Sequence, residues 1–113
     1  MVATSWGREA MAVAALALPM VVGACHSPAG EEGRHIYEAA CASCHEVGAH
    51  GAPRAGSTHD WSARIARGRE SLYRSAIDGR TTGDRIMPPR GGKKTLSDEE
   101  VRAAVDYIVD RSR

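Results

Sequence analysis

The chain has few large side chains from which to build a hydrophobic core. Its 113 residues include no phenylalanine, only two tryptophans and three tyrosines, and only three cysteines. The net charge at pH 7 is +1, so the strongly basic surface typical of nucleic-acid-binding proteins is lacking and no nucleic-acid partner is expected. A domain this small with so few large apolar residues is expected to need a further stabilising component.

No apolar run is long enough to cross a bilayer, which takes about 20 apolar residues in a helix. The longest run covers residues 11–24. This length, ending in small residues, is typical of the hydrophobic region of a signal peptide. We therefore expect residues 1–24 to be removed after Ala24 during export.

Cys25 lies directly after this cleavage site, and the run Val22-Gly23-Ala24-Cys25 resembles a bacterial lipobox. Two interpretations stay open: a lipoprotein anchored through Cys25, and a plain secreted protein with a free thiol. We favour the lipoprotein, because an unpaired thiol is a liability in an oxidising compartment. The predicted location is the periplasm or the periplasm-facing membrane surface, with residues 25–32 as a polar tether and residues 33–113 as the functional domain.

The most informative motif is Cys41-Ala42-Ser43-Cys44-His45, a C-x-x-C-H run. On one helical turn the two cysteines and the histidine project from the same face. The thiols can add to the vinyl groups of a haem while the histidine ligates its iron, and this spacing is the signature of c-type haem attachment. A buried haem would also supply the apolar core that the composition lacks. We therefore predict one haem c, covalently bound through Cys41 and Cys44.

The cysteine pair allows two other interpretations. A thioredoxin-type pair would follow a strand in a βαβ unit, whereas the residues before Cys41 predict a helix. A structural zinc site would need four ligands, and no second Cys or His pair has matching spacing. Haem attachment is the favoured interpretation.

The pattern of apolar residues predicts an all-α fold. We expect a helix over residues 97–111, because Ser97 and Glu100 form a capping box ahead of an apolar stripe. Further helices are expected over residues 32–44, 60–67 and 69–78, with irregular segments over 47–58 and 81–95. No segment alternates with a period of two, so no strands are expected.

Met87 is the favoured sixth ligand of the haem iron, because it is the only methionine after the predicted signal peptide. It precedes two prolines and a pair of glycines, a sequence that can hold a side chain in a rigid loop. His59 and an open coordination position remain as alternatives.

Taken together, the chain resembles class I c-type cytochromes of the cytochrome c5 group. The resemblance runs from about Gly33 to the C-terminus. It rests on Tyr37, the Cys41–His45 site, Gly51-Ala52-Pro53, Trp61, Leu72-Tyr73, Met87-Pro88-Pro89-Arg90-Gly91-Gly92 and the capped last helix. It implies a small class I cytochrome c fold, with about four helices packed around one haem.

The resemblance also implies roles for individual residues. Pro53 would accept a hydrogen bond from the axial His45, and Met87 would be the second axial ligand. Trp61 would lie near a haem propionate and could donate its indole N–H, with simple core packing as the alternative. Gly33 and Tyr37 would pack against the last helix, near Ala104 and Tyr107.

The function expected from these features is that of an electron carrier of the bacterial cell envelope, and no enzymatic activity is expected. Its partners would be reductase and oxidase proteins of a respiratory chain. The alternatives are a small haem subunit of a respiratory complex and, less favoured, a haem enzyme with an open coordination site. The basic residues around the methionine, Arg85, Arg90, Lys93 and Lys94, either steer acidic partners or form a solvated surface.

Overall fold

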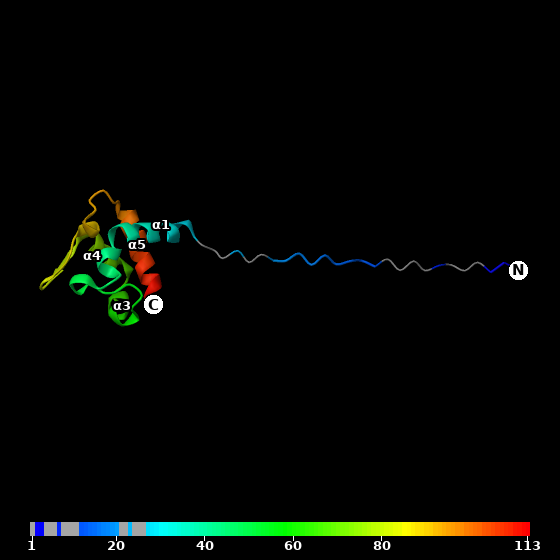
Figure 1. Cartoon of the computed structure of the whole chain (residues 1–113), viewed down its shortest axis with the longest axis horizontal. Helices are drawn as coiled ribbons and strands as arrows, with labels where there is room; N and C mark the ends of the chain where they lie inside the picture. Colours follow the sequence, from blue (N-terminus) through cyan, green and yellow to red (C-terminus); the bar gives the residue numbers. More distant parts are fainter. Residues whose placement is uncertain (1, 4–6, 8–11, 21–22, 24–26) are drawn as a thin grey trace.

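The structure, a computed structural model, describes residues 2–3, 7, 12–20, 23 and 27–113. The described residues before position 27 are exposed and belong to no helix or strand (Figure 1). Cys25, and with it the predicted lipid anchor, lies outside the described residues. In the part of the chain that is described, no helix is both long and apolar enough to cross a membrane.

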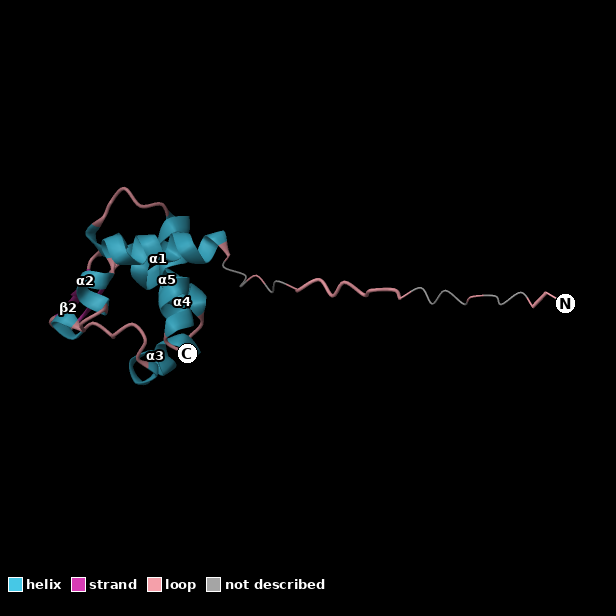
Figure 2. Cartoon of the chain, turned by 45° about the vertical axis from the view of Figure 1, so that its right-hand side comes forward, coloured by secondary structure: helices cyan, strands magenta, loops and turns pink. Residues whose placement is uncertain are grey.

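The domain is mostly helical, which confirms the expected all-α class. Five α-helices lie along the described chain: α1 (Pro28–Ala40), α2 (Ala42–His45), α3 (Thr58–Ala66), α4 (Arg69–Asp78) and α5 (Asp98–Arg111). Two short 3₁₀ helices, η1 (Ala49–Gly51) and η2 (Pro89–Gly92), lie in the connecting segments. The helices α1, α4 and α5 pack together, while α3 lies at one end of the domain (Figure 2).

Helix α1 starts four residues earlier than the sequence predicted, so residues 28–32 of the predicted polar tether are helical. The Ser27 side chain accepts a hydrogen bond from Gly30 N at 3.2 Å, and Pro28 occupies the first helical position. Both residues favour a helix start at this point. Cys41, with φ −117°, then separates α1 from α2, where one continuous helix had been expected.

Helix α5 agrees with the prediction. Ser97 is its N-cap, and the capping box with Glu100 is formed in both directions. The apolar stripe from Val101 to Val109 is buried in the core. The end of α4 at Gly79 is also as predicted.

The expectation of no strands was wrong. Arg80–Thr82 (β1) pairs antiparallel with Arg85–Met87 (β2), with Arg80 opposite Met87. Both strands are short and largely exposed, so neither face is buried and no alternation of apolar residues was needed. Figure 1 shows this hairpin projecting from the helical body. The hairpin therefore supports the segment that carries Met87.

The contact between α1 and α5 forms the centre of the core. A Cβ added at Gly33 would lie 2.8 Å from the carbonyl carbon of Ala103 and closer still to its oxygen. The Tyr37 and Tyr107 rings are in contact, with their centroids 5.2 Å apart. The predicted packing of Gly33 and Tyr37 against the last helix is therefore confirmed, with Ala103 rather than Ala104 opposite the glycine.

Candidate functional site

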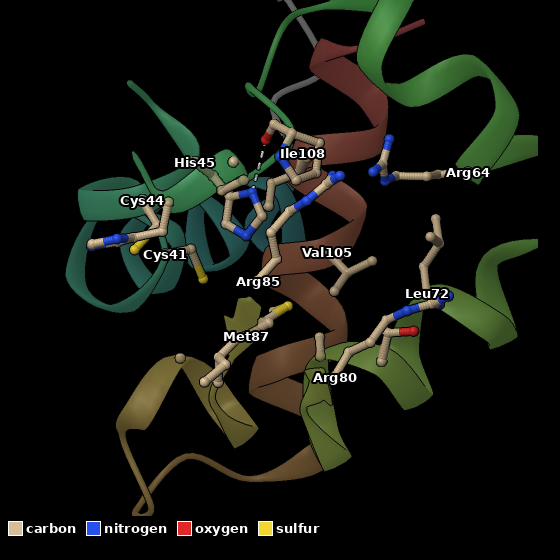
Figure 3. A pocket seen from close by; sticks show the side chains of 18 of the residues that line it. Cys41, Cys44, His45, Arg64, Leu72, Arg80, Arg85, Met87, Val105 and Ile108 are labelled. Carbon is tan, nitrogen blue, oxygen red and sulfur yellow. Dashed lines mark hydrogen bonds between the residues drawn. The ribbon is translucent and has the colours of Figure 1, made fainter. Parts of the chain in front are cut away.

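The residues that the sequence predicted as a haem site line one cavity of about 490 Å³ (Figure 3). This volume lies within the range of about 300–1,000 Å³ usual for ligand sites. Cys41, Cys44 and His45 contribute to its lining from one turn of chain, and Met87 contributes from β2. The apolar part of the wall comes from α3, α4 and α5, including Trp61, Leu72, Val105 and Ile108.

The two cysteines and His45 are brought together by one short turn of helix. The amides of Cys44 and His45 donate to the carbonyl of Cys41, at 3.3 and 3.0 Å. Both thiols are free and half-buried. Burial raises the pKa of the Cys41 thiol to about 11, and the neighbouring Cys44 adds to this effect. Local helical geometry therefore places two thiols and an imidazole at the same wall of the cavity.

His45 is buried and fixed by two backbone contacts. Its Nδ1 lies 2.9 Å from the carbonyl oxygen of Pro53, and its own carbonyl accepts a hydrogen bond from Ala55 N at 2.7 Å. A carbonyl oxygen can only accept, so Nδ1 donates the hydrogen bond, and in a neutral imidazole this leaves the lone pair on Nε2. The contact expected of Pro53 is thus present, and it prepares the imidazole for metal ligation.

Met87 ends β2, and its segment is tied to the rest of the domain on both sides. Before it, the hairpin pairs Met87 with Arg80. After it, η2 brings Gly91 against α1: a Cβ at Gly91 would lie 2.5 Å from the carbonyl oxygen of Ala40. Gly91 also has φ +62°, so a glycine suits this position on both counts. The thioether is therefore carried on a well-supported segment that faces the cavity.

The alternative sixth ligand, His59, lies elsewhere. Its side chain is 97% exposed and contacts Asp60 through Nδ1 at 3.1 Å. It does not line the cavity. Of the other histidines in the described residues, His35 is exposed on α1 and His50 lies at the cavity mouth, in a 3₁₀ turn just after the cysteine motif.

The other interpretations of the cysteine pair also find little support. Cys41 follows a helix and not a strand, unlike a thioredoxin-type pair. No group of three or more His, Cys, Asp or Glu side chains placed to hold a metal ion occurs among the described residues.

Trp61 is buried, with its ring centroid 6.0 Å from that of His45. Its indole N–H donates to the carbonyl oxygen of Arg54 at 2.9 Å. A hydrogen bond from this indole to a propionate would have to replace the Arg54 bond. The propionate role therefore stays a prediction, while the core-packing role agrees with the contacts seen.

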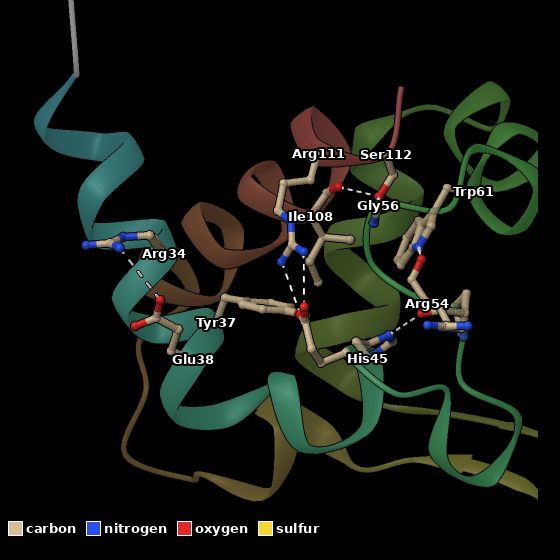
Figure 4. Close-up of polar contacts among 12 residues, drawn as sticks. Arg34, Tyr37, Glu38, His45, Arg54, Gly56, Trp61, Ile108, Arg111 and Ser112 are labelled. Carbon is tan, nitrogen blue, oxygen red and sulfur yellow. Dashed lines mark hydrogen bonds and ion pairs between the residues drawn. The ribbon is translucent and has the colours of Figure 1, made fainter.

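One group of residues next to the site was not found from the sequence. Glu46, directly after His45, accepts two hydrogen bonds from Arg111, at 3.1 and 3.2 Å, and one from the Tyr37 hydroxyl (Figure 4). The Arg111 guanidinium also lies 5.5 Å from the ring centroids of Tyr37 and Tyr107. Glu46 and Arg111 lie 65 residues apart in the sequence, and no local motif signals their contact.

The Glu46 group ties the end of α2 to both α1 and α5. Hydrogen bonds from Arg111 and then from Tyr37 lower the pKa of Glu46. Burial, followed by the bond to Glu46, raises the pKa of Tyr37. At neutral pH the carboxylate is therefore charged and the phenol keeps its proton, which is the state that this hydrogen-bond arrangement requires.

The chemistry of the cavity fits a c-type haem. Its wall is largely apolar, it presents two thiols at the attachment spacing, and an imidazole and a thioether, from His45 and Met87, line it as well. No acidic side chain of the described residues lines the cavity, so none of its lining residues would repel the carboxylates of a haem. Four basic side chains line the cavity instead: Arg64, Arg67, Arg80 and Arg85.

Comparison with known proteins agrees with this fit. The model of the family described as "Cytochrome C oxidase, cbb3-type, subunit III" matches residues 28–108. Cytochrome c-555 of Chlorobaculum tepidum is 40% identical over 81 residues, which cover 72% of this chain and 75% of that protein. Cytochrome c5 of Ectopseudomonas mendocina is 36% identical over 70 residues, which cover 60% of this chain and 76% of that protein.

A solved structure is similar as well. It is a crystal structure of an electron transfer complex of nitrite reductase with cytochrome c, and the matched chain is 36% identical with a TM-score of 0.65. The match covers 77% of this chain and 98% of that one. By its fold, its C-x-x-C-H cavity and its relatives, the chain belongs to the cytochrome c family.

Proposed function

We propose that the protein is an electron carrier of the bacterial cell envelope that uses one covalently bound haem c with His/Met ligation. One observation carries this proposal: Cys41, Cys44, His45 and Met87, three of them in one helical turn and the fourth 42 residues later, line the same apolar cavity. The relatives, which are small cytochromes c, support the role in electron transfer.

Each of these residues has a distinct task. The Cys41 and Cys44 thiols would form the thioethers, and His45 Nε2 and the Met87 sulfur would be the axial ligands. When bound, the haem supplies an iron that changes between the ferric and ferrous states. With both axial positions filled by the protein, no position remains for a substrate, so we expect a carrier and not an enzyme.

The surrounding protein keeps this ligand set rigid. Pro53 fixes the His45 tautomer and ring plane, and the hairpin together with Gly91 fixes the segment of Met87. A thioether ligand also raises the reduction potential compared with a second histidine. A ligand set that moves little between redox states suits a protein that passes single electrons.

The test is to express the full chain with export in a bacterium that matures c-type cytochromes. The purified protein should carry the mass of one haem, lose none of it on denaturation, and show a reversible one-electron wave in voltammetry. A haem that is released by denaturation, or a protein that turns over peroxide with an open coordination position, would contradict the proposal.

A second candidate function is a haem subunit of a respiratory complex, which the description of the matching family favours. Mild detergent extraction of membranes from a strain that carries a tagged version of the protein separates the two. A free carrier elutes alone in gel filtration, whereas a subunit elutes in a stoichiometric complex with other haem proteins.

For the location, we propose export and a lipid anchor on Cys25. The support is in the sequence alone, in the apolar run of residues 11–24 and the lipobox-like residues before Cys25. Two or more acyl chains on Cys25 would give stable membrane attachment, where one chain is marginal. Mass spectrometry of the mature N-terminus and fractionation of a Cys25→Ser variant test this. An unmodified Cys25 in a wild type that fractionates like the variant would favour a plain periplasmic protein.

A further inference from the structure

Arg90 lies three residues after Met87 and has a backbone conformation that suits glycine better than arginine. Its φ is +57°, and it is followed by Gly91 and Gly92, whose φ values are +62° and +84°. A residue with a Cβ is strained in this left-handed region, whereas glycine adopts it readily. Such strain persists only where the surrounding structure holds the residue in place. The contacts of the Arg90 side chain supply that hold.

The Arg90 guanidinium is bonded to two acceptors where helix α5 begins. Its Nη1 donates to the Leu96 carbonyl oxygen at 2.9 Å, and its Nη2 donates to Asp98 Oδ1 at 2.6 Å. Asp98 is the first residue of α5, and the arginine side chain is only 25% exposed. A planar guanidinium that donates from two nitrogens at once is fixed in direction as well as in position. We call Arg90, Leu96 and Asp98 the Arg90 clasp, because together they join the Met87 segment to the start of α5.

The chain between the clasp and the methionine is stiff. Only Pro88 and Pro89 lie between Met87 and Arg90, and the ring of each proline fixes its φ. The turn that follows is closed by a hydrogen bond from Gly91 N to the Pro88 carbonyl oxygen at 3.2 Å. Because these residues have little freedom to absorb a displacement, a movement of Arg90 would be passed on to Met87.

The side chains of Met87 and Arg90 are also close neighbours in space. Both line a second, small cavity of about 20 Å³, to which His45 and Leu96 contribute as well. A cavity of this size has room for no more than about one water molecule, so the side chains around it lie next to one another. The hairpin restrains the chain before Met87, and the clasp restrains the chain after it.

We infer that Arg90 is a positioning residue for the Met87 ligand and acts through its clasp with Leu96 and Asp98. The inference rests on the proposed function, because it requires Met87 to ligate the haem iron. Without the clasp, the segment after the hairpin would be free to move away from the cavity, and the thioether would give way more easily to an external ligand. The clasp thus keeps the sixth coordination position closed, as a protein that only passes electrons requires.

The test is a titration of the ferric holo-protein with imidazole, followed by its absorption spectrum. Imidazole competes with Met87 for the iron, so that an iron–sulfur bond breaks and an iron–nitrogen bond forms with no transfer of electrons. Arg90→Gln removes both bonds of the guanidinium while it keeps a Cβ at the strained position. Asp98→Asn removes the partner charge and keeps the shape of the side chain. Arg90→Lys is the conservative variant, because its ammonium group can still pair with Asp98.

The matched control is Arg69→Gln. Arg69 also bonds to two acceptors on α5, the carboxylates of Asp106 and Asp110. It does so from the first residue of α4, and it lines neither of the two cavities. The control therefore weakens the attachment of α5 by a similar change and leaves the contacts of the Met87 segment intact. Thermal unfolding of each holo-protein records how much general stability each substitution removes.

We expect Arg90→Gln to bind imidazole about 10-fold more tightly than the wild type, since losing a group that orients a metal ligand typically changes metal affinity by about 10–100-fold. Asp98→Asn should change in the same direction by less, and Arg90→Lys should lie between Arg90→Gln and the wild type. Arg69→Gln should bind imidazole like the wild type, even where its melting temperature is lower. An unchanged imidazole affinity in Arg90→Gln would overturn the inference. An equal gain in Arg69→Gln would also overturn it, because the effect would then be a general loosening of α5.

Failure of the proposed function gives a different result. If Met87 does not ligate the iron, the ferric wild type lacks the weak far-red band of a sulfur–iron bond before any imidazole is added. That result would overturn the proposed ligation and the role of Arg90 together. A wild type that shows the band, beside an Arg90→Gln variant with no gain in imidazole affinity, would refute the role of Arg90 alone.

Discussion

Replacing Gly33 by alanine tests the helix contact on which the haem domain depends. The new methyl group would lie 2.8 Å from the Ala103 carbonyl carbon, whereas ordinary contacts start at about 3.4 Å. The Ala103 carbonyl belongs to helix α5 and cannot rotate away. Helices α1 and α5 would therefore have to separate by more than about 0.6 Å, a shift that an interior packed at crystal-like density resists.

Two opposing effects set how much Gly33→Ala changes the free energy of unfolding. Overpacking of a tight core contact costs about 1–3 kcal/mol, whereas an alanine in place of glycine inside a helix contributes up to about 1 kcal/mol. We expect a net loss of about 1–2 kcal/mol in the free energy of unfolding. For a domain of this size that lowers the melting temperature by roughly 5–15 °C.

Gly30→Ala is the matched control. Gly30 belongs to the same helix, is exposed, and has only the Ser27 hydroxyl within reach of an added Cβ, at 3.3 Å. This variant should be as stable as the wild type or slightly more stable, because the gain in helix propensity meets no backbone obstacle. Thermal and denaturant unfolding of the holo-proteins measure the stability of the Gly33→Ala and Gly30→Ala variants. A Gly33→Ala protein as stable as Gly30→Ala would refute the close contact between α1 and α5.

Two further predictions concern the cofactor and pH. A Cys41→Ala/Cys44→Ala protein, which cannot attach haem, should show no cooperative thermal transition because its apolar inventory is too small; a sharp transition would contradict this. Because the pKa of Glu46 is lower in the folded than in the unfolded chain, its contribution to stability is present above about pH 4.3 and is lost as the pH falls through the folded pKa. Since Glu46 is largely exposed, this contribution is at most about 1 kcal/mol, and Glu46→Gln should flatten the acid limb of the stability profile; identical acid limbs would argue against it.

The parts of the structure that the sequence predicted depend on local chemistry. The capping box of Ser97 and Glu100, the stop at Gly79 and the one-turn geometry of the cysteine motif are each set by residues within about one turn of each other. The pairing of His45 with Pro53, eight residues later, needed the family resemblance in addition.

The parts of the structure that could not be predicted from the sequence are either exposed to solvent or formed by residues that are distant in the sequence. The hairpin has no buried face, so periodicity could not detect it, although the two-residue Gly83-Asp84 connection is a recognised hairpin signal. The Glu46–Arg111 contact joins segments that meet only after the helices pack. The position of this contact follows from the fold, and no motif in the chain encodes it.

The ferric absorption spectrum of the exported protein in the far red tests the central claim most directly, namely that Met87 completes the ligand set of a haem bound at Cys41, Cys44 and His45. We predict a weak band in the far red, characteristic of a sulfur–iron(III) bond, that is lost in Met87→Ala while the covalent haem remains. A wild type without the band, or a band that survives the substitution, would contradict the ligation proposed for this cavity.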